Sequence, residues 1–354
     1  MLMECNVTLL QNNMCEGDFI KVSVCVPIYG VERYIEKCVR SLMEQSMKDG
    51  IEFIFVNDCT KDRSIGILES TIEEYPERKS QIKILHHNEN MGLPSARNTA
   101  LKCARGVYIL HCDGDDWVEP EMCDLMYEKA CETGADIVGC GFYENYLNKE
   151  ITIIDDFDLS PLDGLKRFLT MRNMHFNVWQ RLVKKSLYTD NGIFFNPEFN
   201  MGEDCYANFM LHLKAQKLST VKKALYHYRR TNNTSLVRSS GRKGEKDLSR
   251  MLDLVESEIE EHNLTEFVMT EFQSFCYLHK FWQTCFYSSE FDFEWYNNYR
   301  PLLNREFPKL HLPPQVKKLG YISYLTSPYL LKLMIMVNRK LGGFVGKLKN
   351  KQSV

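Results

Sequence analysis

The run Val22-Ser-Val-Cys-Val-Pro-Ile28 is short, almost wholly apolar and rich in β-branched residues. Such a run is typical of a strand that is buried on both faces of a sheet. A second run of the same kind, Ile51-Glu-Phe-Ile-Phe-Val56, follows about twenty residues later. Between them, Ile35, Val39 and Leu42 recur at the spacing of one helical face. The pair of runs therefore predicts a strand–helix–strand unit with parallel strands.

The same alternation continues along the chain to about residue 140. Further strands are predicted at 82–85, at 107–110 and from 135 onward, and helices at 62–74, 94–104 and 119–132. This pattern predicts an α/β fold with a mostly parallel sheet and helices on both faces. From residue 245 onward the chain is helical in pattern, which adds a helical C-terminal extension. In a sheet of this kind, ligands bind beyond the carboxyl ends of the strands.

Composition indicates a globular protein of the cytoplasm. Of the 354 residues 44% are hydrophobic and 26% are charged, and the 13 cysteines are scattered without a CxxC pair. Scattered cysteines in apolar runs fit a reducing compartment. The N-terminus lacks the pattern of a secretory signal, and no apolar stretch reaches the roughly 18–20 residues needed to span a bilayer.

The quartet Asp113-Gly114-Asp115-Asp116 directly follows the fourth predicted strand. Three carboxylates within four residues repel one another unless a cation compensates them. Hard divalent ions such as Mg²⁺ and Mn²⁺ prefer carboxylate oxygens and complete their shells with substrate phosphate. The quartet therefore favours a metal site over its alternative, a solvated turn. Asp58 and Glu32 follow the second and first strands, where a turn or helix cap explains either of them equally well.

Five motifs in order over residues 22–235 resemble glycosyltransferase family 2, the inverting nucleotide-diphospho-sugar transferases with the Rossmann-like GT-A fold. The motifs are Val24-Cys-Val-Pro-Ile-Tyr29, Phe55-Val-Asn-Asp58 with Asp62 and Ser64, Asn90-Met-Gly-Leu-Pro-Ser-Ala-Arg-Asn98, Tyr108-Ile-Leu-His-Cys-Asp-Gly-Asp-Asp-Trp117 and Gly202-Glu-Asp204. Two departures are visible: Gly30 stands where the family usually has Asn, and Cys59 where it usually has Gly. Both are expected to shift a turn slightly without removing a catalytic group.

The resemblance implies a role for each motif. The nucleotide of the donor is expected to contact residues of the first three motifs, namely Pro27, Tyr29, Asp58, Gly92 and Arg97, with Glu32 beside Tyr29 and Asp58. Asp115 is expected to ligate Mn²⁺ or Mg²⁺, with Asp113 at the ribose or in the water shell of the metal and Asp116 as an orienting neighbour. Asp204 is implied as the general base that deprotonates the acceptor, with Glu203 as the substitute.

The segment Tyr226-His-Tyr-Arg-Arg230 has two interpretations of equal weight. Arg229 or His227 could supplement the metal at the leaving diphosphate, or the segment could be a strand with a surface arginine. Trp179 is likewise either an acceptor-side residue, by resemblance, or a buried core residue.

The expected function is metal-assisted, inverting transfer of a sugar, with UDP as the implied carrier, to a saccharide or lipid-linked glycan in polysaccharide biosynthesis. The alternative is a catalytically silent nucleotide-sugar or carbohydrate-binding protein on the same fold. The expected organisation is an N-terminal extension (1–20), a GT-A domain (21–238) and a helical C-terminal region (239–354). Within the GT-A domain, residues 21–118 form the nucleotide-sugar half and residues 119–238 the acceptor half. No nucleic-acid partner is expected.

The C-terminus is strongly basic. The net charge is −3, but nine Lys or Arg residues and no Asp or Glu follow Glu306, so the preceding chain carries −12. Residues 329–337 are apolar except for Lys332, and five cations follow them. This pattern favours a peripheral helix on an anionic membrane surface, at the inner face of the cell membrane, over a helix that packs on the domain.

Overall fold

The structure, a computed structural model, describes residues 19–155, 159–170, 177–199, 201–232, 241–282, 299–314 and 316–318. The basic C-terminal segment and most of the expected N-terminal extension lie outside these residues. Contacts divide the chain into two compact units. The first contains residues up to 161 with 177–197 and 210–232, and the second contains 162–176, 198–209 and 233 onward.

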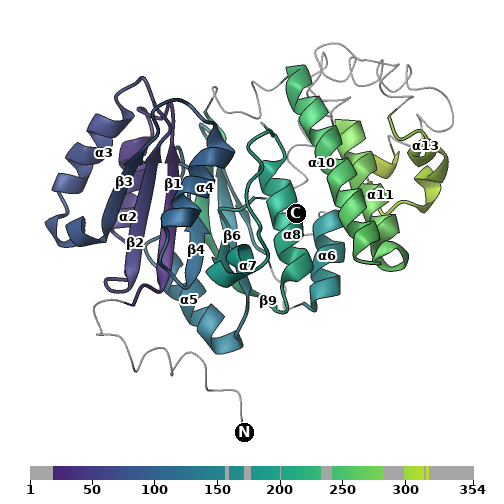
Figure 1. Ribbon diagram of the computed structural model, residues 1–354, viewed down its shortest axis with the longest axis horizontal. Helices are drawn as coiled ribbons and strands as arrows, with labels where there is room; N and C mark the ends of the chain where they lie inside the picture. The colour runs from purple at the N-terminus through teal and green to yellow at the C-terminus, as the bar shows by residue number, and fades with distance from the viewer. Residues whose placement is uncertain are drawn as a thin grey trace, which may run out of the picture. The chain divides into compact units, whose positions relative to one another are not determined.

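The first unit is built on a sheet with the strand order β3-β2-β1-β4-β8-β6-β9-β5, to which β7 is added by pairing with β6 (Figure 1). The strands found in the described residues are β1 (Val22–Ile28), β2 (Ile51–Asn57), β3 (Ile82–His86), β4 (Tyr108–His111), β5 (Trp117–Val118), β6 (Ile137–Asn145), β7 (Glu150–Ile153), β8 (Arg181–Lys184) and β9 (Leu218–Arg229). The predicted α/β fold is thereby confirmed, and the first four predicted strands begin and end within one residue of the observed ones.

The sheet has two halves that differ in direction. The pairs β2–β3, β1–β2 and β1–β4 are all parallel, so the carboxyl ends of these strands lie at one edge. Beyond β4 the sheet is mixed, because β8 runs antiparallel to both β4 and β6 whereas β9 runs parallel to β6. The mixed half brings β9 and β5 together as an antiparallel pair, with Trp117 opposite His227.

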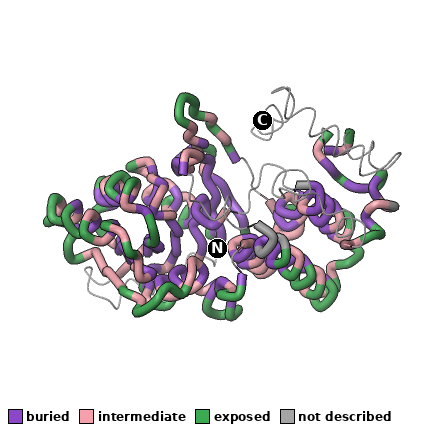
Figure 2. Tube along the Cα trace, turned by 90° about the horizontal axis from the view of Figure 1, so that it is seen from above, coloured by how far each residue is buried: buried purple, intermediate pink, exposed green. Residues whose placement is uncertain are grey.

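The helices of the first unit cover a sheet in which strands such as β1, β2 and β4 are buried (Figure 2). They are α2 (Ile35–Met43), α3 (Ser64–Glu73), α4 (Leu93–Cys103), α5 (Met122–Thr133) and α7 (Lys185–Thr189), with a short 3-10 helix η1 (Pro76–Gln81). The apolar faces of α2 and α5 share one core cluster with alternate residues of β1 such as Val24 and Val26. Because side chains alternate across a strand, Cys25 belongs to the opposite face, and α4 packs against β1 and β2.

The second unit is helical. Its elements are α6 (Pro161–Thr170), the first turns of α8 (Glu203–Lys214), α10 (Gly241–Glu261), α11 (Thr265–Trp282), α13 (Leu302–Glu306) and the 3-10 turn η3 (Phe307–Lys309). Buried aromatic rings form its core: Phe168 lies 6.5 Å from Phe209 and 6.4 Å from Phe275 between ring centroids. The described part of the C-terminal region is therefore helical, as its pattern predicts.

Candidate functional site

The loops that follow β1, β2 and β4 meet at the carboxyl edge of the parallel half of the sheet. Hydrogen bonds join the first two loops: the amide of Gly30 donates to Thr60 Oγ1 (2.9 Å), and that of Glu32 donates to Asp62 Oδ2 (3.0 Å). Partial burial opposes the charge of Asp62, but hydrogen bonds from Ser64, Glu32 and Thr60 outweigh it and lower the pKa of this carboxyl. The two loops therefore form one surface.

Tyr29 and Glu32 both lie on this surface, but only Glu32 is hydrogen-bonded to the loop after β2. Tyr29 is 54% exposed and is therefore accessible to a ligand. Glu32 accepts a hydrogen bond from the amide of Arg63 (3.1 Å), which ties it to the loop after β2. Both positions remain predictions as nucleotide contacts.

Asp58 is buried and organises the neighbouring loop. One carboxylate oxygen accepts hydrogen bonds from His87 Nδ1 (2.7 Å) and the amide of Met91 (2.8 Å), and the other accepts from the amide of Gly92 (2.8 Å). Gly92 precedes α4 with φ +87°, a conformation that glycine adopts without steric cost. In the structure Asp58 thus holds the Asn90–Gly92 turn at the start of α4.

The two departures from the family pattern both fall on left-handed backbone. Gly30 has φ +68° and Cys59 has φ +55°. Glycine takes this conformation freely, whereas a residue with a Cβ is disfavoured there by about 1–2 kcal/mol. Glycine at position 30 therefore relaxes the backbone of the first loop, whereas cysteine at position 59 strains the backbone of the second loop.

The acidic quartet forms a tight turn against β1. The amide of Asp116 donates to the carbonyl of Asp113 (3.0 Å). A Cβ on Gly114 would lie 3.0 Å from the carbonyl oxygen of Pro27 and 3.3 Å from Val31 Cγ2. Glycine at this position therefore allows the three carboxylates to approach the end of β1.

Asp113 is paired with Arg97. The guanidinium of Arg97, which is buried, donates from Nη2 to Asp113 Oδ1 (2.9 Å). Arg97 therefore reaches a carboxylate of the site, and its direct contact with a nucleotide stays a prediction.

The side chain of Asn98, next to Arg97 in the sequence, holds Phe195 by two hydrogen bonds. Its Nδ2 donates to the carbonyl of Phe195 (2.6 Å), and its Oδ1 accepts from the backbone N–H of Phe195 (2.9 Å). The ring of Phe195 lies 5.5 Å from the Arg97 guanidinium and 5.1 Å from the ring of His111. Burial lowers the pKa of His111 to about 3, so this ring is a neutral packing group near neutral pH.

Asp116 is bound from β9. Its Oδ2 accepts from the hydroxyl of Tyr226 (2.8 Å), and its Oδ1 accepts from the amide of Arg229 (2.7 Å). The same Tyr226 hydroxyl accepts from the amide of Asp113 (3.1 Å). Burial, together with the charges of Asp115 and Asp113, raises the pKa of Asp116 well above its ordinary value. Asp116 therefore locks β9 to the acidic turn.

Trp179 is buried and supports Tyr226. Their rings stack with centroids 4.2 Å apart, and Tyr228 stacks on the same indole at 5.4 Å. Of the two interpretations of Trp179, the structure supports the core one.

Asp115 is half-buried, and its role as a metal ligand stays a prediction. Its Oδ2 accepts from the side-chain amide of Asn232 (2.7 Å), and its backbone carbonyl accepts from Arg229 Nε (2.7 Å). Burial and the neighbouring charge of Asp113 raise the pKa of Asp115. A divalent cation would relieve this crowding. Among the residues that the structure describes, no group of three or more His, Cys, Asp or Glu side chains forms a metal cage. The carboxylates thus fit an ion that takes one or two protein ligands and fills its shell from a substrate.

Arg229 lies between two aromatic rings. Its guanidinium is 4.7 Å from the ring centroids of both Tyr34 and Trp117, which is within cation–π range. Its neighbour His227 stacks on Trp117 and bonds to Glu119 Oε1 (2.7 Å) through Nε2. The segment is thus a strand, as one interpretation expects. Arg229 also lies beside Asp115, and the role of Arg229 or His227 at a leaving diphosphate stays a prediction.

Glu203 and Asp204 belong to the second unit. They open α8, and the amide of Cys205 donates to Asp204 Oδ1 (2.8 Å). Glu203 is buried, whereas Asp204 is partly exposed. Gly202 precedes them with φ +86°, and a Cβ there would lie 3.1 Å from Leu248 Cδ2 of α10. Close packing on α10 therefore fixes the start of this helix.

Tyr226, Asn232 and Asn98 are the contributors that sequence reasoning missed. Tyr226 and Tyr228 are two residues apart on β9, so their side chains lie on the same face of the strand. A strand over this segment therefore predicts that the two rings are neighbours. No sequence signal points to Asn232. Asn98 stands in a recognised motif, but its partner is 97 residues away.

We expect Tyr226→Phe to destabilise the first unit by about 1–3 kcal/mol, because the amide of Asp113 and one oxygen of Asp116 would lose a buried partner. The ring and its stacking on Trp179 would be retained. Urea unfolding measures the change. Tyr228→Phe is the matched control, because its hydroxyl has no hydrogen bond to any residue that the structure describes. Equal stability of the two variants would contradict the locking role of Tyr226.

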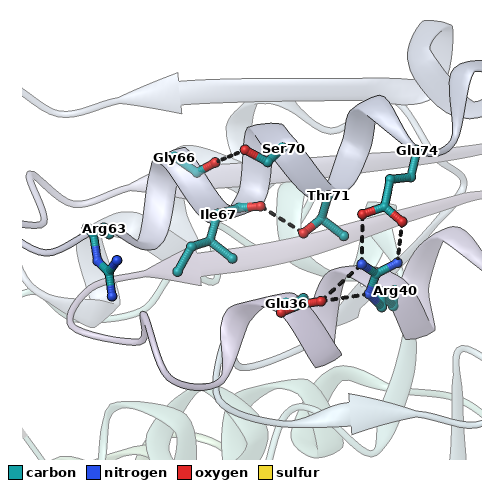
Figure 3. A pocket seen from close by; sticks show the side chains of 8 residues that line it. All are labelled: Glu36, Arg40, Arg63, Gly66, Ile67, Ser70, Thr71 and Glu74. Carbon is teal, nitrogen blue, oxygen red and sulfur yellow. Dashed lines mark hydrogen bonds and ion pairs between the residues drawn. The ribbon is translucent and has the colours of Figure 1, made fainter.

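A groove between α2 and α3 lies apart from these residues (Figure 3). Its main cation, Arg40, donates to both carboxylate oxygens of Glu74 (2.8 and 2.7 Å) and to Glu36 (3.0 Å). These charges are compensated within the groove, so we place no binding site there.

Comparison with known proteins identifies the family. The family model for glycosyl transferase family 2 matches residues 23–179. An uncharacterised glycosyltransferase of Bacillus subtilis, EpsJ, is 35% identical over 220 residues, which are 60% of this chain and 62% of EpsJ. The putative glycosyltransferase EpsH of the same organism is 31% identical over 264 residues, which are 73% of this chain and 74% of EpsH.

A solved structure has the same fold. The crystal structure of residues 1–349 of Staphylococcus aureus TarS in complex with UDP-GlcNAc matches with a TM-score of 0.67 at 19% identity, over 92% of this chain and 93% of that one. TarS, a poly(ribitol-phosphate) β-N-acetylglucosaminyltransferase, is 27% identical over 225 residues, 59% of this chain and 35% of TarS.

Proposed function

The chain belongs to glycosyl transferase family 2, and from that premise we propose that it transfers a sugar from a nucleoside diphosphate to a glycan or lipid-linked saccharide, with inversion at the anomeric carbon. The observation that carries the proposal is the acidic turn Asp113–Asp116, held by Arg97 and Tyr226 beside Arg229.

The donor lies on the loops at the carboxyl edge of the parallel strands. Tyr29, which is exposed, contacts the base, and Glu32 and Asp58 shape the ribose and base pocket. Pro27 and Gly92 supply the backbone turns that border it, and Arg97 acts through Asp113. A UDP-sugar is the proposed donor, since TarS, a member of the same fold, binds UDP-GlcNAc.

Asp115, with Asp113 beside it, holds a Mn²⁺ or Mg²⁺ ion in this proposal. When bound, the ion offsets the negative charge that develops on the departing diphosphate. Asn232 orients Asp115. Arg229 is held near the acidic turn by its Nε bond to the Asp115 carbonyl, which supports a role for its terminal N–H groups in binding the departing oxygens.

Asp204 accepts the proton of the acceptor hydroxyl. The hydroxyl oxygen forms a bond to the anomeric carbon while the bond from that carbon to the diphosphate oxygen breaks on the opposite face, which inverts the configuration. Asp204 is favoured over Glu203 as the base because Asp204 is partly exposed and Glu203 is buried.

A thermal-unfolding screen of nucleotide sugars in Mn²⁺ tests the proposal, because a ligand that binds only the folded state raises its stability. A UDP-sugar is expected to raise the melting temperature, and to raise it less when the metal is chelated. If none of the UDP-, GDP-, ADP-, CMP- and dTDP-sugars shifted the transition, the donor assignment would be wrong.

We also propose that the enzyme acts in polysaccharide biosynthesis at the cytoplasmic face of the membrane, with the basic C-terminal segment as its contact. None of the helices in the described part of the chain is long and apolar enough to cross a bilayer. Liposome flotation with and without residues 326–354 tests the contact, and equal recovery of the two forms on anionic vesicles would end the idea.

A further inference from the structure

Lys37 lies beside the acidic turn without a role in the reaction described above. It is on α2, one turn after Tyr34, and its ammonium is 3.3 Å from the ring centroid of Trp117. Trp117 directly follows the acidic quartet and is also within 4.7 Å of the Arg229 guanidinium. Lys37 is exposed, so its ammonium remains accessible to a ligand. One indole ring thus carries two cations.

The charge of Glu150 acts on Lys37, and the charges of Asp115 and Arg229 act on each other. Neither Lys37 nor Arg229 forms an ion pair with a carboxylate of any described residue. Partial burial and the like charge of Arg229 lower the pKa of Lys37, and the charge of Glu150 opposes this shift without cancelling it. An anion bound between Lys37 and Arg229 would interact favourably with both positive charges.

The donors suit a phosphoryl group in particular. Arg229 uses Nε for the carbonyl of Asp115, which leaves its two terminal nitrogens for an outside acceptor. A guanidinium matches phosphate oxygens with paired N–H groups, and an ammonium adds a point charge. Tyr34 and Trp117 hold the guanidinium between their rings, so its orientation is fixed before a ligand arrives.

We propose that Lys37 and Arg229 form a phosphoryl clamp beside Trp117, in which Lys37 is a binding residue for a phosphate of the substrate. The inference rests on the proposed function for its primary ligand, the diphosphate of the donor. A phosphate of the acceptor offers the same chemistry, and the two sources differ in which probe depends on Lys37.

Lys37→Met in the full chain, in Mg²⁺, tests the clamp by calorimetry with UDP, uridine, inorganic pyrophosphate and glycerol phosphate. Methionine keeps the length of the side chain and removes the charge. Loss of one charged contact is expected to weaken UDP and pyrophosphate about tenfold and to leave uridine unchanged. If glycerol phosphate alone were weakened, the clamp would hold with the acceptor as its source.

Two matched variants isolate the charge at this position. Lys37→Arg is expected to restore pyrophosphate binding. Lys102→Met, an exposed lysine in the last turn of α4, is expected to change nothing. Unchanged binding of every phosphorylated probe by a folded Lys37→Met protein would overturn the proposal. Wild-type protein that bound pyrophosphate through Lys37 but no UDP would contradict the proposed function and leave the clamp standing.

Discussion

Asp115→Asn is expected to lower turnover by about 10²–10³-fold, the size of effect seen when one group that stabilises developing negative charge is removed. Asparagine keeps the shape of the side chain and an oxygen that can accept from Asn232. Only the charge is lost, so the variant separates metal binding from local geometry. Initial rates with a UDP-sugar in Mn²⁺ measure the effect.

The same substitution should not destabilise the metal-free protein. Burial and the charge of Asp113 raise the pKa of Asp115, which means that the folded state disfavours this carboxylate in its ionised form. Removing the charge therefore relieves a cost, and the melting temperature without metal should stay the same or rise. Added Mn²⁺ should stabilise the wild type and not the variant.

Asp190→Asn is the control for this experiment, because Asp190 is exposed at the end of α7 and undergoes the same chemical change. It is expected to behave as the wild type in both assays. Turnover of Asp115→Asn at the wild-type rate would remove Asp115 from the metal site.

The sequence predicted the parallel half of the sheet well because three of its strands, β1, β2 and β4, are buried on both faces. Apolar runs such as Val22–Ile28 have a single polar residue, Ser23, and their ends coincide with turns. The mixed half was harder to predict. β8 has four residues and β5 has two, and lengths of this order carry no periodic signal.

The composition of the site was predictable, but its internal contacts were not. The crowding of the quartet is visible in four consecutive letters, whereas the groups that hold it come from distant segments. Tyr226 is 113 residues from Asp113, and Asn232 is 117 residues from Asp115. A sequence shows that a carboxylate follows a strand, but it does not show which donor the fold brings to each oxygen.

The three carboxylates of the quartet also differ in their hydrogen-bond partners, which the sequence does not show. Asp113 is paired with an arginine, Asp116 with a tyrosine hydroxyl and a backbone amide, and Asp115 with an asparagine. Asp116 is buried and both of its oxygens accept hydrogen bonds, whereas Asp113 and Asp115 are half-buried. We therefore expect Asp115, which has no arginine partner through its carboxylate among the described residues, to be the metal ligand rather than Asp116.

Asp204→Asn is expected to lower turnover by about 10²–10⁴-fold, the usual contribution of a general base. The affinity for the donor should not change, because the base acts on the acceptor hydroxyl and makes no contact with the nucleotide in this mechanism. Calorimetry with UDP-sugar and initial rates with acceptor measure the two quantities separately.

Glu203→Gln is the matched variant, one residue away at the start of the same helix. The first turn of a helix favours a negative charge, and Glu203 and Asp204 both lie in the first turn of α8. The helix therefore does not distinguish the two candidate bases, but their exposure does. Glu203 is 7% exposed and Asp204 is more accessible. Glu203→Gln should therefore affect stability more than the chemical step. If Glu203→Gln lost transfer and a folded Asp204→Asn kept it, the proton would go to Glu203 and the assignment of the base would be reversed.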